Sequence, residues 1–185
     1  MKTIKYLSIF LIAGLLFVAC SDDDNGNPDP VNEEEVITTM NITLTPEGGG
    51  TAITFSYQDL DADGPNPPTV TAPNLAGNTT YNATIEVLNE TESPAEDITV
   101  EVEAEDDEHQ FIFQIGGSVA SATATDQDGN GNPVGLSFDL VTNTAGAGGL
   151  TVTLRHEPTK PNDGTLSGAG GETDIAATFN FNITN

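Results

Sequence analysis

The sequence predicts an all-β domain, a two-sheet antiparallel β-sandwich of the Ig-like type built from two related halves, with at most one short helix. Three observations lead to this prediction. Apolar and polar residues alternate along several short segments, glycine-rich turns separate these segments, and the two halves repeat each other at a spacing of about 67 residues. Alternation with a period of two is typical of half-buried strands, and short strands at regular spacing favour a sandwich.

The alternation is clearest at the start of the predicted domain. Residues 40–45 alternate between apolar and polar types, and residues 53–57 repeat the pattern. The segment 47–50 between them contains three glycines, which readily adopt the positive φ angles of tight turns, so these two strands should form a hairpin. Further strands are expected at 81–89, 109–115, 118–125, 135–141, 150–155 and 174–184.

The segment 94–108 carries two conflicting signals. Ser93 and Glu96 form a Ser-x-x-Glu capping box with Pro94 at the first helical position, which predicts a short helix. Residues 98–102 alternate between apolar and polar types instead, as in a strand. The sequence therefore leaves helix and strand open in this segment.

A shift of 67 residues brings the two halves into register. Because a few strands cannot close a core alone, each half should supply part of one sandwich. The shift places Gly49-Gly50 on Gly116-Gly117, Asp59 on Asp126, Asp61 on Asp128, Asp63 on Asn130, Gly64 on Gly131, Ile85 on Val152, Val87 on Leu154, Glu90 on Glu157 and Pro94 on Pro161.

Residues 1–19 have the pattern of an export signal. Two lysines precede a 13-residue, largely apolar run, which is shorter than the roughly 20 residues needed to span a bilayer. The run ends at Phe17-Val18-Ala19-Cys20, which resembles a lipobox, so Cys20 is expected to carry lipid and to become the mature N-terminus. An ordinary secretory signal is the alternative. Because Cys20 is the only cysteine, a lipidated chain has no thiol left for disulfides, nucleophilic catalysis or metal binding.

Residues 20–35 read as the lipidated cysteine and an acidic tether, and residues 36–185 as a single domain of about 150 residues. The tract Ser21-Asp22-Asp23-Asp24 resembles the export tract of Bacteroidota surface lipoproteins, which directs a protein to the outer face of the outer membrane. The alternative is a solvated acidic linker without a targeting role. We therefore expect a lipid anchor in the outer membrane and a domain that faces the cell exterior.

The charge of the mature chain restricts its partners. Without the signal, the chain keeps 29 acidic residues and two basic residues, Arg155 and Lys160, for a formal charge of −27. Nucleic acid and anionic lipid headgroups are poor partners for such a surface, whereas cations are favourable ones.

Two acidic loops at matching points of the repeat are candidate calcium sites, and both fit the first half of a calcium loop, D-x-[DN]-x-[DN]-G. Their predicted ligands are Asp59, Asp61, Asp63, Asp126, Asp128 and Asn130. Side chains at loop positions 1, 3 and 5 can converge on Ca²⁺ when a glycine at position 6 turns the chain. Position 12 lacks the usual Glu, so the remaining ligands must be carbonyls such as those of Pro65 or Asn132, water, or another carboxylate such as Asp139. The sequence predicts weak binding, with a Kd of roughly 0.1 to 1 mM, against the alternative of plain acidic turns.

A weaker candidate lies at the end of the predicted strand 150–155. Arg155 and His156 are adjacent there and could clamp a carboxylate or contribute to a zinc site. Zinc needs three or four ligands, and His109 and His156 are the only imidazoles. The sequence favours a strand-end cluster in which Arg155 offsets local negative charge, and a strand-end position for His109. The chain contains no Walker, G-x-G-x-x-G or G-x-S-x-G motif.

Several features together resemble a group of small Bacteroidota surface lipoproteins of unknown activity. They are the acidic tether, the Glu-rich stretch 101–108, the phrase Glu108-His109-Gln110-Phe111, the D-x-D-x-N-G loop and the Leu-Arg-His-Glu-Pro ending. Members of that group are sometimes labelled as type 1 periplasmic binding fold proteins, a fold that alternates parallel strands with helices in two lobes. The residues argue against that fold, because the chain has at most one predicted helix and is too short. The resemblance supplies no catalytic residues.

These observations predict a non-enzymatic, lipid-anchored binding or adhesion module on the cell surface, with Ca²⁺ as a stabilising ion. Its partners are the outer membrane, through the lipid, and an extracellular ligand or surface protein, with no nucleic acid. The alternative is a hydrolase of extracellular polymers with a carboxylate pair as acid and base. Carboxylates are so numerous that no pair stands out, and the absence of Trp weakens a sugar-stacking site.

The predicted localisation depends on two separable signals. Cys20→Ala should release or mislocalise the protein because the lipid is lost. Replacing Asp22, Asp23 and Asp24 by Ala should leave the protein lipidated but facing the periplasm. Proteolysis of whole cells measures which side the domain faces. Full surface accessibility of the triple variant would contradict the export role of the tract.

Overall fold

The computed structural model describes residues 35–61 and 64–185. The predicted signal, Cys20 and residues 20–34 of the predicted tether lie outside the described residues, as does Asp63 of the first acidic loop. Within the described part, no helix is long and apolar enough to cross a membrane.

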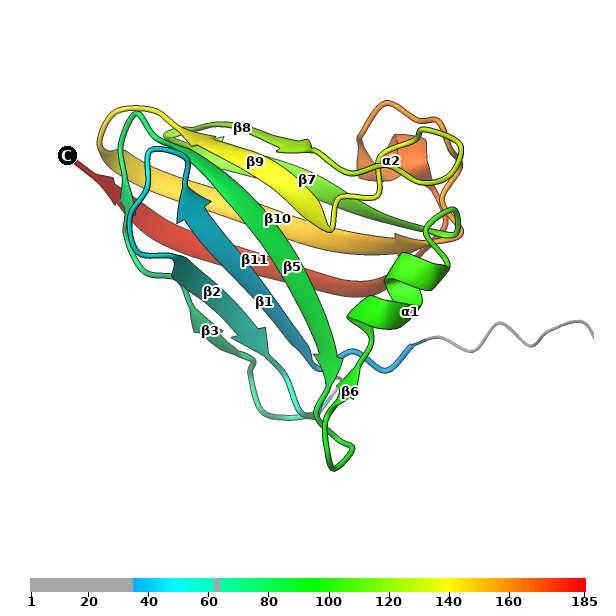
Figure 1. The fold of residues 1–185 in the computed structure, drawn as a ribbon. Coiled ribbons are helices and arrows are strands. Elements are labelled where there is room, and N and C mark those ends of the chain that lie inside the picture. The colour runs from blue at the N-terminus through cyan, green and yellow to red at the C-terminus, as the bar shows by residue number, and fades with distance from the viewer. Residues whose placement is uncertain (1–34, 62–63) are drawn as a thin grey trace, which may run out of the picture. The chain divides into compact units, whose positions relative to one another are not determined.

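Two sheets pack face to face and form an all-β sandwich, as the sequence predicts (Figure 1). The first sheet has seven strands, in the order β3 (Thr69–Thr71), β2 (Ile53–Gln58), β1 (Thr39–Pro46), β5 (Thr80–Asn89), β9 (Ser137–Thr142) and β8 (Val119–Ala124), with β6 (Glu96–Asp97) paired to the end of β5. The second sheet has four, in the order β4 (Leu75–Ala76), β11 (Glu172–Thr184), β10 (Gly146–His156) and β7 (His109–Gly117). Neighbours are antiparallel, except that β4 pairs with the end of β11 in parallel.

Every strand that the alternation predicts is present. The first two strands form the expected hairpin, in which Ile42 lies opposite Phe55 and Gly49 takes a φ of 85° in the turn. The three short strands β3, β4 and β6 were not predicted, because two or three residues are too few to show an alternation.

The ambiguous segment 94–108 contains both kinds of structure, β6 followed by the helix α1 (Thr99–Ala104). The helix begins later than the capping box predicts, and the Thr99 backbone N–H donates to Asp97 Oδ1 at 3.1 Å. Ile98 and Val102 are buried while Val100 is 61% exposed, because residues four apart share one helical face. The apparent alternation was therefore half of a helical pattern.

A second helix, α2 (Leu166–Ala169), makes the prediction of at most one short helix wrong. The repeat contains the reason, since α1 and α2 begin 67 residues apart. The pairs β2 with β8 and β5 with β10 also begin 66 residues apart. The two halves do not each form one sheet, however, because β8 and β9 of the second half join the first sheet beside β5. The sandwich is thus one unit with shared layers.

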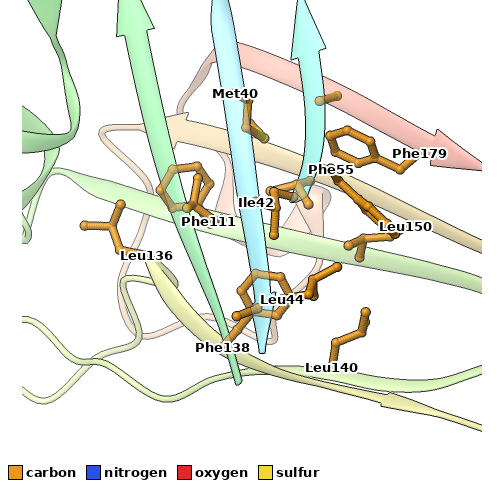
Figure 2. Packing of buried hydrophobic residues seen from close by; sticks show 14 of the residues in the cluster. Met40, Ile42, Leu44, Phe55, Phe111, Leu136, Phe138, Leu140, Leu150 and Phe179 are labelled. Atoms are coloured by element: carbon orange, nitrogen blue, oxygen red, sulfur yellow. The ribbon is translucent and has the colours of Figure 1, made fainter. Parts of the chain in front are cut away.

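The core lies between the two sheets and is almost entirely apolar. Figure 2 shows Phe55 of the first sheet facing Phe179 of the second, and their ring centroids are 5.4 Å apart. Phe113 and Phe138 form a similar contact between the sheets at 4.4 Å. Because the described residues include no cysteine, this packing and the strand hydrogen bonds hold the domain together.

Chemically active side chains gather at one end of the sandwich, which we call the loop end. This end contains Thr39 of the first sheet, with Gln58 and Leu88 opposite it on the neighbouring strands. It also contains His109 of the second sheet, which lies opposite His156. Figure 1 shows α1 and α2 at this end, with the C-terminus at the other. Both acidic loops follow strands that end here, β2 and β8.

Candidate functional site

In the first acidic loop, Asp59 and Asp61 have different hydrogen-bond partners. Asp59 Oδ2 accepts a long hydrogen bond from the Tyr57 hydroxyl at 3.5 Å, while burial and the neighbouring Asp59 charge raise the pKa of Tyr57. Asp61 Oδ2 accepts from Asn66 Nδ2 at 2.7 Å. The loop borders a cavity of about 250 Å³. Because Asp63 lies outside the described residues, calcium binding in this loop stays a prediction.

The second acidic loop is braced by its own carboxylates. Asp126 Oδ1 accepts the Gly135 backbone N–H at 2.7 Å, and Asp126 Oδ2 accepts that of Ser137 at 3.0 Å. Asp128 Oδ1 accepts the backbone N–H groups of Asn130 at 2.9 Å and Asn132 at 2.8 Å. The two aspartates of the predicted calcium loop therefore point at backbone donors.

Lys160 supplies a cation to the second loop. Its Nζ lies 3.3 Å from Asp128 Oδ2, and the side chains are 6% and 0% exposed. Burial raises the pKa of the Asp128 carboxyl, but hydrogen bonds from Asn132, Asn130 and Lys160 outweigh it and lower the pKa to about 2. Calcium ligation by Asp128 would have to compete with these donors, and sequence reasoning gave Lys160 no such role.

Two surface cavities flank the second acidic loop. The larger, of about 450 Å³, is polar and lined by Asp107, Asp128, Asn130, Asn132, Pro158, Lys160 and Pro161. The smaller, of about 250 Å³, is lined by Glu103, Asp106, Asp126, Gln127, Val134, Leu136 and Ser137. The loop 126–132 therefore forms a wall shared by two depressions at the loop end.

A buried cluster of two histidines and two carboxylates lies at the same end of the sandwich. Strand pairing brings His109, the first residue of β7, opposite His156, the last residue of β10. Asp174 sits at an irregularity of β11, where the pairing shifts from Ile175 to Thr173. Such a bulge re-aims a side chain, and the Asp174 side chain is only 1% exposed. Glu35, close before β1, completes the cluster.

The four side chains face one another at short range. His109 Nε2 lies 3.2 Å from Glu35 Oε1, and His156 Nδ1 lies 3.5 Å from Glu35 Oε2 and 3.7 Å from Asp174 Oδ1. The two imidazole rings stack with centroids 4.6 Å apart. One ligand atom from each residue can be chosen so that all lie within 4.8 Å of one another. This geometry suits a bound cation or a set of shared protons.

Further acidic side chains lie beside the cluster, next to α1. Glu101 and Glu105 of the α1 region approach Glu35, and one carboxylate oxygen from each of the three lies within 4.8 Å of the others. Burial raises the pKa of Glu101, and the negative charges of Glu35, Glu105 and Glu96 raise it further. Negative charge is therefore concentrated between α1 and the sandwich.

The sequence correctly predicts that both histidines lie at strand ends, but it does not predict that their side chains are in contact. The alternation already puts His156 on the buried face with Leu154, but only the strand register shows that His109 lies opposite. Arg155, expected to offset negative charge beside His156, points to the other face and donates from Nε to the Gly170 carbonyl at 2.7 Å. Glu35, which the sequence analysis assigns to the tether, packs into the cluster.

Fold and site together define an all-β sandwich with a buried histidine–carboxylate cluster and a braced acidic loop at one end. No family model, curated protein or solved structure matches the chain.

The Asp128 carboxylate should make stability depend on acid. Its pKa in the folded protein, about 2, is below the ordinary aspartate value of 3.8, so the folded state favours the charged form. The stabilisation is present above about pH 4 and is lost as the pH falls towards 2. Asp128→Asn should lower the free energy of unfolding by about 1 to 3 kcal/mol at pH 7, and the difference from wild type should shrink in acid.

Urea denaturation between pH 2 and 7 measures this difference. Asp107→Asn is the matched control, since Asp107 is exposed and lines the same cavity. A loss in Asp107→Asn as large as that in Asp128→Asn would show that the hydrogen bonds of Asp128 are not its cause.

The calcium prediction is tested by thermal melting of the full-length protein. If the acidic loops bind Ca²⁺, the melting temperature should rise by several degrees more in Ca²⁺ than in Mg²⁺ at equal ionic strength. The rise should shrink in Asp59→Ala/Asp61→Ala and in Asp126→Ala/Asp128→Ala. Because Asp128 also stabilises the loop without any ion, the readout is the calcium-dependent shift. Equal stabilisation by both ions, unchanged in both variants, would leave the loops as acidic turns.

Proposed function

We propose that this chain is a lipid-anchored, non-enzymatic binding or adhesion module of the cell surface, with the loop end of the sandwich as its ligand-binding face. The anchor at Cys20 and the outer-membrane location are taken from the sequence pattern and from the resemblance to Bacteroidota surface lipoproteins.

The observation that carries this function is the second acidic loop, which lies between two cavities and is held in place by hydrogen bonds within residues 126–137. Four hydrogen bonds from backbone N–H groups to Asp126 and Asp128 fix the loop, at 2.7, 2.8, 2.9 and 3.0 Å. Binding residues are commonly presented by loops that a rigid scaffold positions. Asn130 is exposed at the rim of the larger cavity and is therefore available to a ligand.

The burial of the most reactive groups favours binding over hydrolysis. A general acid or base must reach the substrate, directly or through one water. The Glu35 and Asp174 side chains are 6% and 1% exposed, so a polymer chain does not reach them in this arrangement. One observation favours the alternative of a hydrolase, since Glu103, Asp106 and Asp126 line one cavity. Asp126 already accepts two backbone hydrogen bonds, so Glu103 and Asp106 are the carboxylates left for such a role.

Charge indicates the kind of partner that the loop end would accept. Residues 90–108 include ten acidic and no basic residues, and most of the acidic ones are exposed. A cationic surface, or an anionic polymer bridged by divalent cations, complements this face. Because such attraction is screened within about 10 Å at 0.1 M salt, binding should weaken as salt increases.

A two-readout assay tests binding against hydrolysis. The full-length protein is incubated with insoluble extracellular glycans, with and without Ca²⁺, and with polylysine-coated beads. We expect salt-sensitive retention on at least one probe and no release of reducing ends. Retention should fall about tenfold or more in Asp107→Asn/Asn130→Ala, a loss of roughly 1.4 kcal/mol or more.

The matched control is Glu47→Gln/Asn74→Ala, which likewise neutralises one carboxylate and truncates one asparagine, at exposed sites away from the loop end. It should bind like wild type. Release of reducing ends by wild type that is lost in Glu103→Gln/Asp106→Asn would establish the hydrolase instead. Equal loss of retention in both double variants would show that the loop end is not the binding face.

A further inference from the structure

We propose that Glu35, His109, His156 and Asp174 form a closed site for one divalent transition-metal ion of the zinc class. This ion ties the start of the domain to the second sheet. The inference is independent of the proposed binding function, because the cluster is buried beneath the loop end rather than displayed on it.

The hydrogen bond made by His109 shows which of its ring nitrogens carries a proton. Its Nδ1 lies 3.1 Å from the Glu105 backbone carbonyl oxygen. A carbonyl oxygen only accepts, so Nδ1 carries a proton, and in a neutral ring Nε2 is the unprotonated nitrogen. The Nε2 lone pair then faces the Glu35 carboxylate at 3.2 Å. Two acceptors in this position repel each other unless a proton or a metal ion lies between them.

The same arrangement is typical of metal-binding histidines. Such a histidine usually donates its second ring N–H to a carbonyl or carboxylate, which fixes the tautomer and directs the other nitrogen at the metal. Glu105 supplies that carbonyl from the end of α1. The His109 ring is fully buried, so water does not supply a partner from bulk solvent.

Three of the separations between the four residues are close to those of a tetrahedral ion. Zinc bonds of about 2.0 to 2.2 Å to nitrogen and oxygen imply distances of about 3.3 to 3.5 Å between neighbouring ligand atoms. The contacts here are 3.2, 3.5 and 3.7 Å, from His109 to Glu35, from His156 to Glu35 and from His156 to Asp174. One ligand atom from each residue lies within 4.8 Å of the others, so the wider pairs would have to move closer for the site to close around a metal ion.

Charge balance favours a divalent ion over protons alone. Glu35 and Asp174 bring two carboxyl groups into the buried cluster, where negative charge is costly unless positive charge lies close by. If both histidines carried a positive charge, two imidazolium rings would stack at 4.6 Å and repel each other. One divalent ion compensates both carboxylates while both rings stay neutral, and neutral imidazole is the metal-binding form.

The donor set selects the class of ion. Two imidazole nitrogens with two carboxylates suit zinc and its transition-metal neighbours, whereas calcium and magnesium prefer oxygen ligands only. Four protein ligands leave no open position, which is the mark of a structural rather than a catalytic zinc site. The ion would join Glu35, close before β1, to the ends of β7, β10 and β11. In a domain without disulfides it would replace a covalent cross-link.

Metal titration of the full-length protein tests the site. The protein is purified in detergent, stripped with a chelator and titrated with Zn²⁺ against a chromophoric competitor. We expect one Zn²⁺ per chain, a higher melting temperature, and no comparable effect of Mg²⁺ or Ca²⁺. Glu35→Gln and Asp174→Asn, which keep the side-chain shape, should each weaken Zn²⁺ binding by about 100-fold or more.

Glu172→Gln is the matched control, because Glu172 is exposed on the same strand two residues before Asp174. It should bind Zn²⁺ like wild type. Far-ultraviolet circular dichroism checks that each variant is folded. Stoichiometric binding that survives in both Glu35→Gln and Asp174→Asn, or that is lost only in Asp126→Ala/Asp128→Ala, would place the ion elsewhere and overturn the proposal.

A readout on the wild-type protein does not depend on the folding of any variant. The chain has two histidines, so the ring nitrogens in its ¹⁵N spectrum can be assigned with a single histidine variant. Zn²⁺ should shift Nε2 of His109 and one ring nitrogen of His156 to the values of metal-bound imidazole, and Co²⁺ should give the visible absorption of a tetrahedral site. Unshifted ring nitrogens at one equivalent of Zn²⁺ would overturn the proposal.

Discussion

The pairing of β10 with both of its neighbours is the interaction on which the site depends. This strand pairs with β7 over nine residues and with β11 over eleven, so its last residue is held from both sides. His156 therefore meets His109 across one edge and the bulge that contains Asp174 across the other. A slip of one residue in either register would turn the strand's side chains to the opposite face and separate the four groups.

The strands were predictable from the sequence and the cluster was not, for one physical reason. Alternation depends on neighbours along the chain, and it marks β1, β2 and β5 without any knowledge of their partners. The cluster depends on register between β7, β10 and β11 and on a bulge, and these are set by packing across the sandwich. Glu35 was hidden for another reason. It follows an acidic run in the sequence, so its charge suggested solvent although its side chain is 6% exposed.

The repeat in the sequence also predicts a second helix. It matches α2 to α1, so the second helix could have been inferred from the first. It also matches the two acidic loops, yet only the second, in the part of the chain that the structure describes, is seen paired with a lysine. Lys160 lies outside the D-x-D-x-N-G motif and reaches Asp128 from the segment after β10. A motif defines which oxygens can converge, but the donors that already bind them, from the neighbouring backbone and from Lys160, decide whether those oxygens remain available to an ion.

The acidity of this chain and the burial of its cluster are connected. Compact folding brings many negative charges together and opposes stability by repulsion, which the two basic residues of the domain offset only locally. The positive charge of Lys160 compensates the negative charge of the Asp128 carboxylate, and the Arg155 side chain donates a hydrogen bond to the Gly170 carbonyl. The carboxylates around Glu35, Glu101 and Glu105 have no lysine or arginine within ion-pair distance among the described residues, and the nearest positively chargeable groups there are the two histidines. A divalent ion bound to both histidines would supply positive charge beside these carboxylates, and it would do so at Glu35, close before the first strand.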